Sequence, residues 1–243
     1  MIKFFRHIRK NLMEQNKTSK YLKYAIGEII LVVIGILIAL SINNWNESLK
    51  ERQLEAYYLE QIHDEFLSNK EQFDLIISIH KRSYRSAQWL LDNAPFDSAD
   101  IDSLRKHIDL YRYSFTYNPS QSSISTIINN GHLNLLTDKK LRNTLVKWNE
   151  LILDYKEEET YNRNYYDNMI APFGIKHFTL YSKRKEERFD NVLTFDQSTM
   201  HEFLNIVATK RRLLNQIVDN KELEYLKVKQ SIDFILEKTA DYD

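Results

Sequence analysis

The sequence predicts an all-α protein. An N-terminal amphipathic helix precedes one transmembrane helix, which continues into an elongated antiparallel helical bundle outside the cytoplasm. Residues 29–40 contain no polar side chain, and with residues 25–27 and 42 the apolar span approaches the roughly 20 residues that cross a bilayer. Downstream, apolar residues recur at helical spacing. The 243 residues include only four glycines and three prolines, which disfavours a turn-rich β fold.

Three parts are predicted: a basic tail (residues 1–23), a transmembrane helix (24–45) and an extracytoplasmic domain (46–243). The tail carries seven basic residues and one acidic residue, a net charge of +6, and the rest of the neutral chain therefore carries −6. Basic residues accumulate on the cytoplasmic side of a span, so we expect the N-terminus in the cytoplasm. The C-terminal domain then lies outside it, which is the periplasm in a Gram-negative bacterium.

The apolar stretch is predicted to be an uncleaved signal anchor. It is longer than the core of a signal peptide and runs into Ser41 and Asn43 without a small-residue cleavage motif. Tyr24 and Trp45 stand at its two ends, where amphipathic rings favour the headgroup layer.

The tail is predicted to be a basic amphipathic helix that lies on the anionic inner leaflet of the lipid bilayer. Its apolar residues fall near helical spacing, with basic residues between them: Ile2, Phe4, Phe5, Ile8 and Leu12. Nucleic acid is not expected as a partner, because the nearest polyanion is the membrane and the rest of the chain is mildly acidic.

Glu28 lies about one turn inside the cytoplasmic end of the span, and two interpretations stay open. The carboxylate reaches the interface by snorkelling, or it faces a helix in the membrane. Glu28, Gly35, Ala39 and Ile42 share one helical face, and Gly35-x-x-x-Ala39 permits close helix approach. The second interpretation implies a membrane-protein partner or a second copy of the chain.

The extracytoplasmic part is predicted to contain long and short helices. The first runs from residue 46 to about 91 and ends before Pro95, and a shorter one follows over 98–113. Ser120 opens another short helix, which Gly131 ends in the left-handed conformation.

Two further long helices complete the prediction. The first spans 138–170, is capped by Thr137 and is ended by Pro172 and Gly174. Residues 173–195 are predicted to be a loop, with a small hairpin as the alternative. Asp196 or Ser198 then caps a helix over 200–238.

No catalytic motif is present, so we expect no enzyme, no catalytic or metal-binding residue and no cofactor. Phosphate-cradling loops need clustered glycines, and cysteine is absent. Glu60-x-x-His63 is a single copy of a unit that di-iron bundles use twice. The acidic run 157–159 is predicted to be a solvated helix face.

Aromatic residues are unusually frequent, with fifteen tyrosines. Most are interpreted as bundle core, and two alternatives stay open: a small-ligand pocket, or a partner surface around residues 111–135. The residues of that surface would be Tyr111, Tyr113, Phe115, Tyr117 and Gly131.

Three segments carry a resemblance to a known family. They are residues 1–6 (MIKFFR), residues 19–46 (from SKYLKYAIGEIILVV to INNWN), and residues 125–136 (STIINNGHLNLL), which precede Leu141-Arg142. In these segments the chain resembles a family of uncharacterised single-span membrane proteins from Bacteroidota. The resemblance implies an inner-membrane protein with a helical periplasmic domain, and it brings no activity with it.

Two functions are considered. The first is contact with other proteins, as an accessory or scaffold component of an envelope complex or as a homo-oligomer. The alternative is a ligand-sensing bundle that signals through a membrane partner, an analogy based on architecture.

Overall fold

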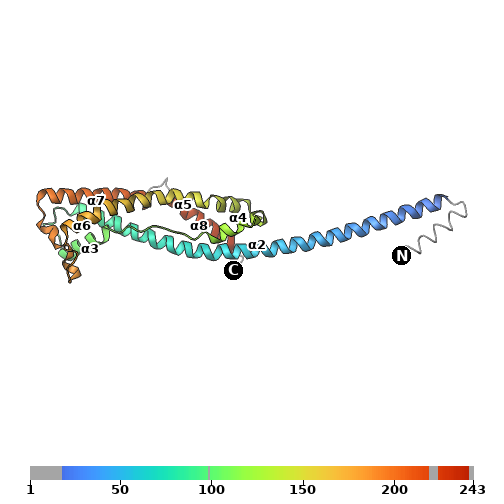
Figure 1. Ribbon diagram of the computed structural model, residues 1–243, viewed down its shortest axis with the longest axis horizontal. Coiled ribbons are helices and arrows are strands. Elements are labelled where there is room, and N and C mark those ends of the chain that lie inside the picture. The colour runs from blue at the N-terminus through green and yellow to red at the C-terminus, as the bar shows by residue number, and fades with distance from the viewer. Residues whose placement is uncertain (1–17, 98, 219–223, 241–243) are drawn as a thin grey trace. The chain divides into compact units, whose positions relative to one another are not determined.

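The computed structural model describes residues 18–97, 99–218 and 224–240 (Figure 1). Over these ranges the chain forms seven α-helices with short 3₁₀ and π segments and no strand, which confirms the all-α prediction. The predicted amphipathic helix of the tail falls on residues 1–17, outside the described ranges. The chain divides into two compact units, Met1–Glu55 and Ala56–Asp243.

Helix α2 (Thr18–Asp92) is a single helix of 75 residues that contributes to both units. As predicted, it ends just before Pro95, where the backbone and side-chain amides of Asn93 both donate to the carbonyl of Trp89. Within the first unit, the large apolar side chains between Ile29 and Ile42 are 47–63% exposed. By length and composition the helix can span a membrane, which would cover this apolar surface.

In the second unit, α2 packs alongside α5 (Lys139–Tyr165) in the same direction. Phe66 packs on Trp148 with ring centroids 4.9 Å apart. Two helical turns further along both helices, Phe73 packs on Tyr155 with ring centroids 5.8 Å apart. The contacting residue numbers increase in the same direction on α2 and on α5, so the two helices are parallel. A parallel pair requires the chain to travel back along the bundle between them.

The last two helices, α7 (Gln197–Val218) and α8 (Glu224–Thr239), run antiparallel to the pair. On α2, His63 bonds Thr239 at 2.8 Å, whereas Lys70 contacts Asp233 at 3.1 Å. The order of partners is reversed, so α8 is antiparallel to α2. The bundle-like packing agrees with the prediction, but α2 and α5 within it are parallel, which the prediction of an antiparallel bundle did not include. Figure 1 shows α7 and α8 beside α5.

The chain travels back through α3 (Ile101–Tyr111), an extended stretch over residues 112–121, and α4 (Ser122–Asn129). We call residues 112–121 the return segment. Gly131 follows α4 with φ of 71°, which confirms its predicted left-handed conformation. A short 3₁₀ turn, His132–Leu135, leads into α5.

A row of polar side chains on α2 holds this returning chain. The Ser83 hydroxyl donates to the Tyr111 carbonyl at 2.7 Å. Nearer the N-terminus of α2, the Asn69 side-chain amide bonds both backbone groups of Ser120, as a residue of an adjacent β-strand would. Its Nδ2 donates to the Ser120 carbonyl at 2.9 Å, and the Ser120 amide donates to its Oδ1 at 2.8 Å. Tyr58 pairs with His132 at 2.8 Å. We call the α2 side chains that bond the returning chain the polar row.

Glu65, in the same row, caps α4 from another helix. Gln121 occupies the N-cap position but gives no side-chain bond. Instead, the Ser123 amide donates to Glu65 Oε2 at 2.9 Å, and the hydroxyls of Ser120 and Ser122 donate to the same oxygen. A carboxylate at a helix N-terminus satisfies free amides and complements the helix dipole.

Some predicted helix ends were displaced. Asp138, not Thr137, caps α5, accepting from the Lys140 and Leu141 amides at 2.7 and 3.0 Å. Pro172 does not end the helical path: after a π segment (Tyr166–Ile170) it enters the first turn of α6 (Ala171–His177).

The C-terminal third follows the prediction in most respects. Residues 178–184 are irregular and 3₁₀ turns cover Lys185–Thr194, which fits the loop rather than the hairpin. Asp196 caps α7, as predicted, by accepting from the Thr199 amide at 2.7 Å. The predicted helix 200–238 is described as two segments, α7 and α8, with residues 219–223 outside the description.

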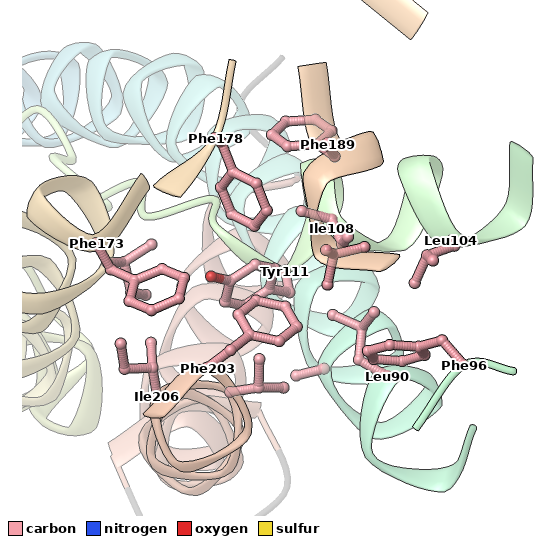
Figure 2. Close-up of a cluster of buried hydrophobic side chains, with 14 residues drawn as sticks. Leu90, Phe96, Leu104, Ile108, Tyr111, Phe173, Phe178, Phe189, Phe203 and Ile206 are labelled. Atoms are coloured by element: carbon pink, nitrogen blue, oxygen red, sulfur yellow. The ribbon is translucent and has the colours of Figure 1, made fainter. Parts of the chain in front are cut away.

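Aromatic side chains fill the core at the end of the bundle where α2 terminates (Figure 2). Phe203 lies at the centre, stacked on Phe173 at 5.8 Å and edge-on to Tyr111 at 6.0 Å. Phe178 and Phe189 close the cluster against α3 and the 3₁₀ turns. These rings belong to the core, which agrees with the main interpretation of the aromatic residues.

We expect Asn69→Ala to lower the free energy of unfolding by about 2 kcal/mol, because both backbone groups of Ser120 lose their partner. The measurement is urea denaturation of the full chain in mild detergent, followed by circular dichroism. Gln72→Ala is the control on the same helix: exposed Gln72 accepts one bond of 3.3 Å, from the Asn118 amide, and its loss should cost less than about 0.5 kcal/mol. Equal losses would contradict the role assigned to Asn69.

Candidate functional site

The predicted helix-packing residues lie on the exposed part of α2. Gly35, Ala39 and Ile42 are exposed and Glu28 is partly buried. Apart from the adjacent residues and the local helix backbone, no atom of the described residues lies within 4 Å of the position that a Cβ would take on Gly35, so this face is open there. Its role in helix packing stays a prediction.

The predicted partner surface does not form one surface. Tyr111 and Tyr117 are fully buried in the core, whereas Tyr113 and Phe115 reach the exterior. Gly131 is exposed near the Tyr58 end of the bundle. Tyr58 and Ser83, which hold the two ends of the returning chain, are about 25 residues apart on α2, roughly 37 Å at 1.5 Å per residue.

Tyr113 and Phe115 instead help to form a pocket of about 270 Å³. Its walls come from the start of the return segment and from the end of α5, and six residues line it: Arg112, Tyr113, Ser114, Phe115, Arg163 and Tyr166. Alternate residues of an extended chain point to opposite sides. Ser114 can therefore bond inward while its neighbours face outward.

Ser114 joins the pocket wall to a buried polar group on α5 and α7. The Lys210 ammonium, fully buried, donates to Asn162 Oδ1 at 2.7 Å and to the Ser114 hydroxyl at 3.2 Å. Asn162 Nδ2 also donates to that hydroxyl, at 3.0 Å. Burial, with a smaller contribution from the charge of Arg163, lowers the pKa of Lys210 to about 7.

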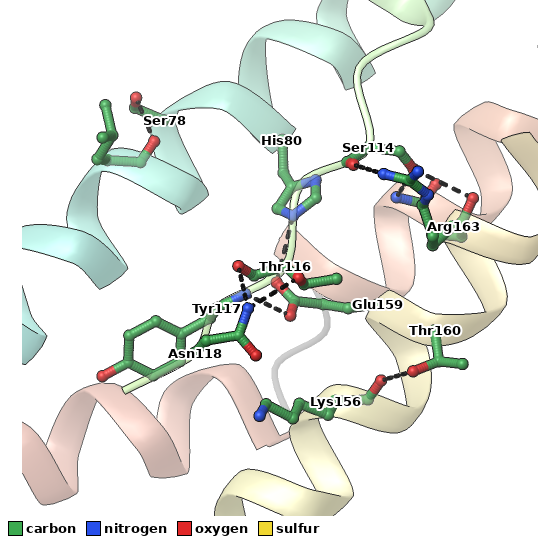
Figure 3. A network of polar contacts seen from close by, with 12 residues as sticks. Ser78, His80, Ser114, Thr116, Tyr117, Asn118, Lys156, Glu159, Thr160 and Arg163 are labelled. Atoms are coloured by element: carbon green, nitrogen blue, oxygen red, sulfur yellow. Dashed lines mark hydrogen bonds and ion pairs between the residues drawn. The ribbon is translucent and has the colours of Figure 1, made fainter. Parts of the chain in front are cut away.

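One turn earlier on α5, Glu159 forms a second buried group (Figure 3). Its Oε2 accepts from the Tyr117 amide at 2.7 Å, and His80 Nε2 on α2 donates to Oε1 at 3.3 Å. Glu159 and His80 are both fully buried. Burial raises the pKa of the nearby Tyr155 hydroxyl, and the Glu159 charge raises it further.

The acidic run 157–159 was therefore misinterpreted as a solvated face. Glu157 is exposed, but Glu159 projects between α2 and the return segment. A helix turns about 100° per residue, so two residues are enough to move from the solvent side to the core side.

The Glu60-x-x-His63 pair is also separated by the fold. Glu60 is exposed, whereas His63 is buried and bonds Thr239 of α8 at 2.8 Å. His63 thus fastens α8 to α2. In the described part of the chain, no group of three or more His, Asp or Glu side chains is arranged to hold a metal ion.

Comparison with known proteins gives a family. A family model described as a family of unknown function matches residues 28–196. The chain belongs to DUF6090. The match to DUF6090 includes most of the predicted span, from residue 28 onward, together with the polar row and all six pocket residues, whereas Lys210 lies beyond its end. Searches of curated proteins and of solved structures find no match.

Glu159→Leu should lower the free energy of unfolding by about 3 kcal/mol, because the Tyr117 amide and His80 Nε2 lose their acceptor in the interior. Glu159→Gln keeps an acceptor oxygen and should cost about 1 kcal/mol. Denaturation of the full chain in detergent gives both values. The exposed neighbour supplies the control, since Glu157→Leu should change stability by less than about 0.5 kcal/mol.

Lys210 should make the protein more stable as pH rises above 7. Its pKa is about 7 when folded and 10.5 in a free side chain, so between these values the unfolded chain binds the extra proton. The free energy of unfolding should rise with pH there, by at most about 1.4 kcal/mol per unit, and stay flat below. Comparing wild type with Lys210→Met between pH 6 and 9 measures this contribution.

The exposed Lys176→Met provides the control for that series, because an exposed ammonium is solvated in both states. It should leave the slope of the wild type unchanged. A slope that Lys210→Met also retains would show that other groups cause the pH dependence.

Proposed function

We propose that the protein is anchored in a bacterial inner membrane by α2 and acts through protein–protein contact. It would serve as an accessory or scaffold subunit of an envelope complex, or assemble with itself. The supporting observation is the open face of α2, where Gly35 and Ala39 leave room for a second helix.

The orientation proposed is single-pass, with the N-terminus in the cytoplasm and residues 46–243 in the periplasm. The net charge of +6 in residues 1–23 supports it, because basic residues are retained on the cytoplasmic side. Interfacial positions of Tyr24 and Trp45 are consistent with the same span.

The partner proposed is a transmembrane helix, either of another envelope protein or of a second copy. In lipid, helices associate through close packing, because the hydrocarbon offers no hydrophobic drive. Small residues let two backbones approach, and a side chain on the same face would keep them apart.

Gly35→Leu should therefore weaken association by about tenfold or more, while the single chain accommodates the new side chain without a clash. The measurement is cross-linking and mass photometry of protein purified in mild detergent. Val33→Leu is the matched control, because it adds bulk two residues away, on the opposite side of the helix. A wild-type particle that is strictly monomeric and carries no co-purifying protein would refute the proposal.

A further inference from the structure

We propose that the pocket between the return segment and α5 binds a small organic anion: a carboxylate attached to a flat aromatic ring. This goes beyond the proposed contact function, which rests on the membrane helix. The pocket volume of about 270 Å³ lies just below the usual range for ligand sites, roughly 300–1,000 Å³, and suits one ring with a short side chain.

Two arginines give the pocket its charge preference. Arg112 donates from Nη2 to Asp109 at 2.6 Å, and its buried Nε has no partner among the described residues. Arg163 donates from Nε to Asp167 at 3.1 Å, and its contact to the Ser114 carbonyl is long, at 3.5 Å. Each guanidinium therefore keeps donor groups beyond its ion pair.

No acidic side chain is among the six that line the pocket. An entering anion thus meets guanidinium groups first, and a guanidinium matches a carboxylate with two parallel bonds. A further basic group stands behind the wall, because the Lys210 ammonium bonds the Ser114 hydroxyl at 3.2 Å. A neutral ligand would not gain the charge-assisted bonds that the guanidinium groups offer to a carboxylate.

Three aromatic rings give the preference for a flat ligand. Tyr113 and Phe115 stand edge to face with centroids 5.9 Å apart, and Phe115 remains 47% exposed. On the facing wall, the Arg163 guanidinium lies 5.8 Å from the Tyr166 ring centroid. Rings and guanidinium planes at these positions offer flat surfaces for stacking, which an inorganic ion cannot use.

Side chains around the pocket are held in place before any ligand arrives. Asp109 fixes Arg112 and also accepts from the Tyr113 hydroxyl at 3.4 Å. Tyr166 is the first residue of the π segment, and single π turns are frequent at functional sites. A preformed site loses less entropy on binding.

The test is calorimetric titration of the full chain in nanodiscs, with empty nanodiscs subtracted. Phenylacetate is the probe, and it should bind saturably. Acetate lacks the ring and phenylacetamide lacks the charge, so each should bind about tenfold more weakly or worse. Inorganic phosphate should also bind about tenfold more weakly or worse, since it cannot stack.

Variants locate the binding. Arg163→Met removes an exposed guanidinium without threatening the core and should weaken phenylacetate binding by about tenfold. Arg112→Met should do the same, with an unchanged melting curve required for its use. Arg184→Met removes a more exposed, ion-paired arginine outside the pocket and should leave binding unchanged.

The proposal fails if phenylacetate shows no saturable binding up to about 10 mM, at least tenfold weaker than the sub-millimolar affinity expected of such a site. It also fails if phenylacetamide or phosphate binds as well as phenylacetate, or if Arg163→Met binds like the wild type. These results are independent of oligomeric state, so they separate this inference from the contact function.

Discussion

The bundle depends on the hydrogen bonds that hold an extended chain between two parallel helices. Because α2 and α5 run in the same direction, residues 112–121 must cross back along most of the bundle without helical bonds of their own. Buried amides and carbonyls need partners wherever the chain runs. The polar row on α2 supplies many of them, with Asn69 and Ser83 bonding the backbone of Ser120 and Tyr111.

The two ends of the returning chain find their hydrogen-bond partners on different helices. Near α4 the partners come from α2 alone, through Glu65 and Asn69. Near the pocket they come from α5 as well, where Glu159 accepts the Tyr117 amide and the Asn162 carbonyl accepts the Ser114 hydroxyl. The interior is most polar at this second end, where a cation, an amide, a carboxylate and an imidazole are buried within one turn of α5 and its neighbours.

Much of this fold follows from periodicity, and much of the site does not. The long uninterrupted helix, its end before Pro95 and the turn at Gly131 are local consequences of which residues break or cap helices. The burial of Glu159 and Lys210 could be inferred from their positions on the apolar stripes of their helices. Glu159 follows Tyr155 by four residues, and Lys210 follows Val207 by three. Such positions predict burial, but only the tertiary fold names the partners.

The pocket itself was beyond sequence reasoning, because it combines residues 112–115 with Arg163 and Tyr166 from another element. The aromatic residues of the return segment indicated a binding surface in this region. The predicted surface was broader than the pocket and ran from Tyr111 to Gly131. Strand-like alternation does not predict this division, because the four aromatic residues are two positions apart and would share one face. Tyr111 ends helix α3 in the core and Tyr117 is buried beside Glu159, whereas Tyr113 and Phe115 between them line the pocket.

The buried polar groups have a cost that apolar side chains would not, since their desolvation is only partly repaid by their bonds. What they add is register. Apolar contacts are non-directional, so an apolar seam would hold the returning chain in several alignments of similar energy. Asn69, Ser83 and Glu159 each accept one alignment, because each bonds a specific backbone group. That alignment sets Arg112 and Phe115 opposite Tyr166, and the pocket exists only in it.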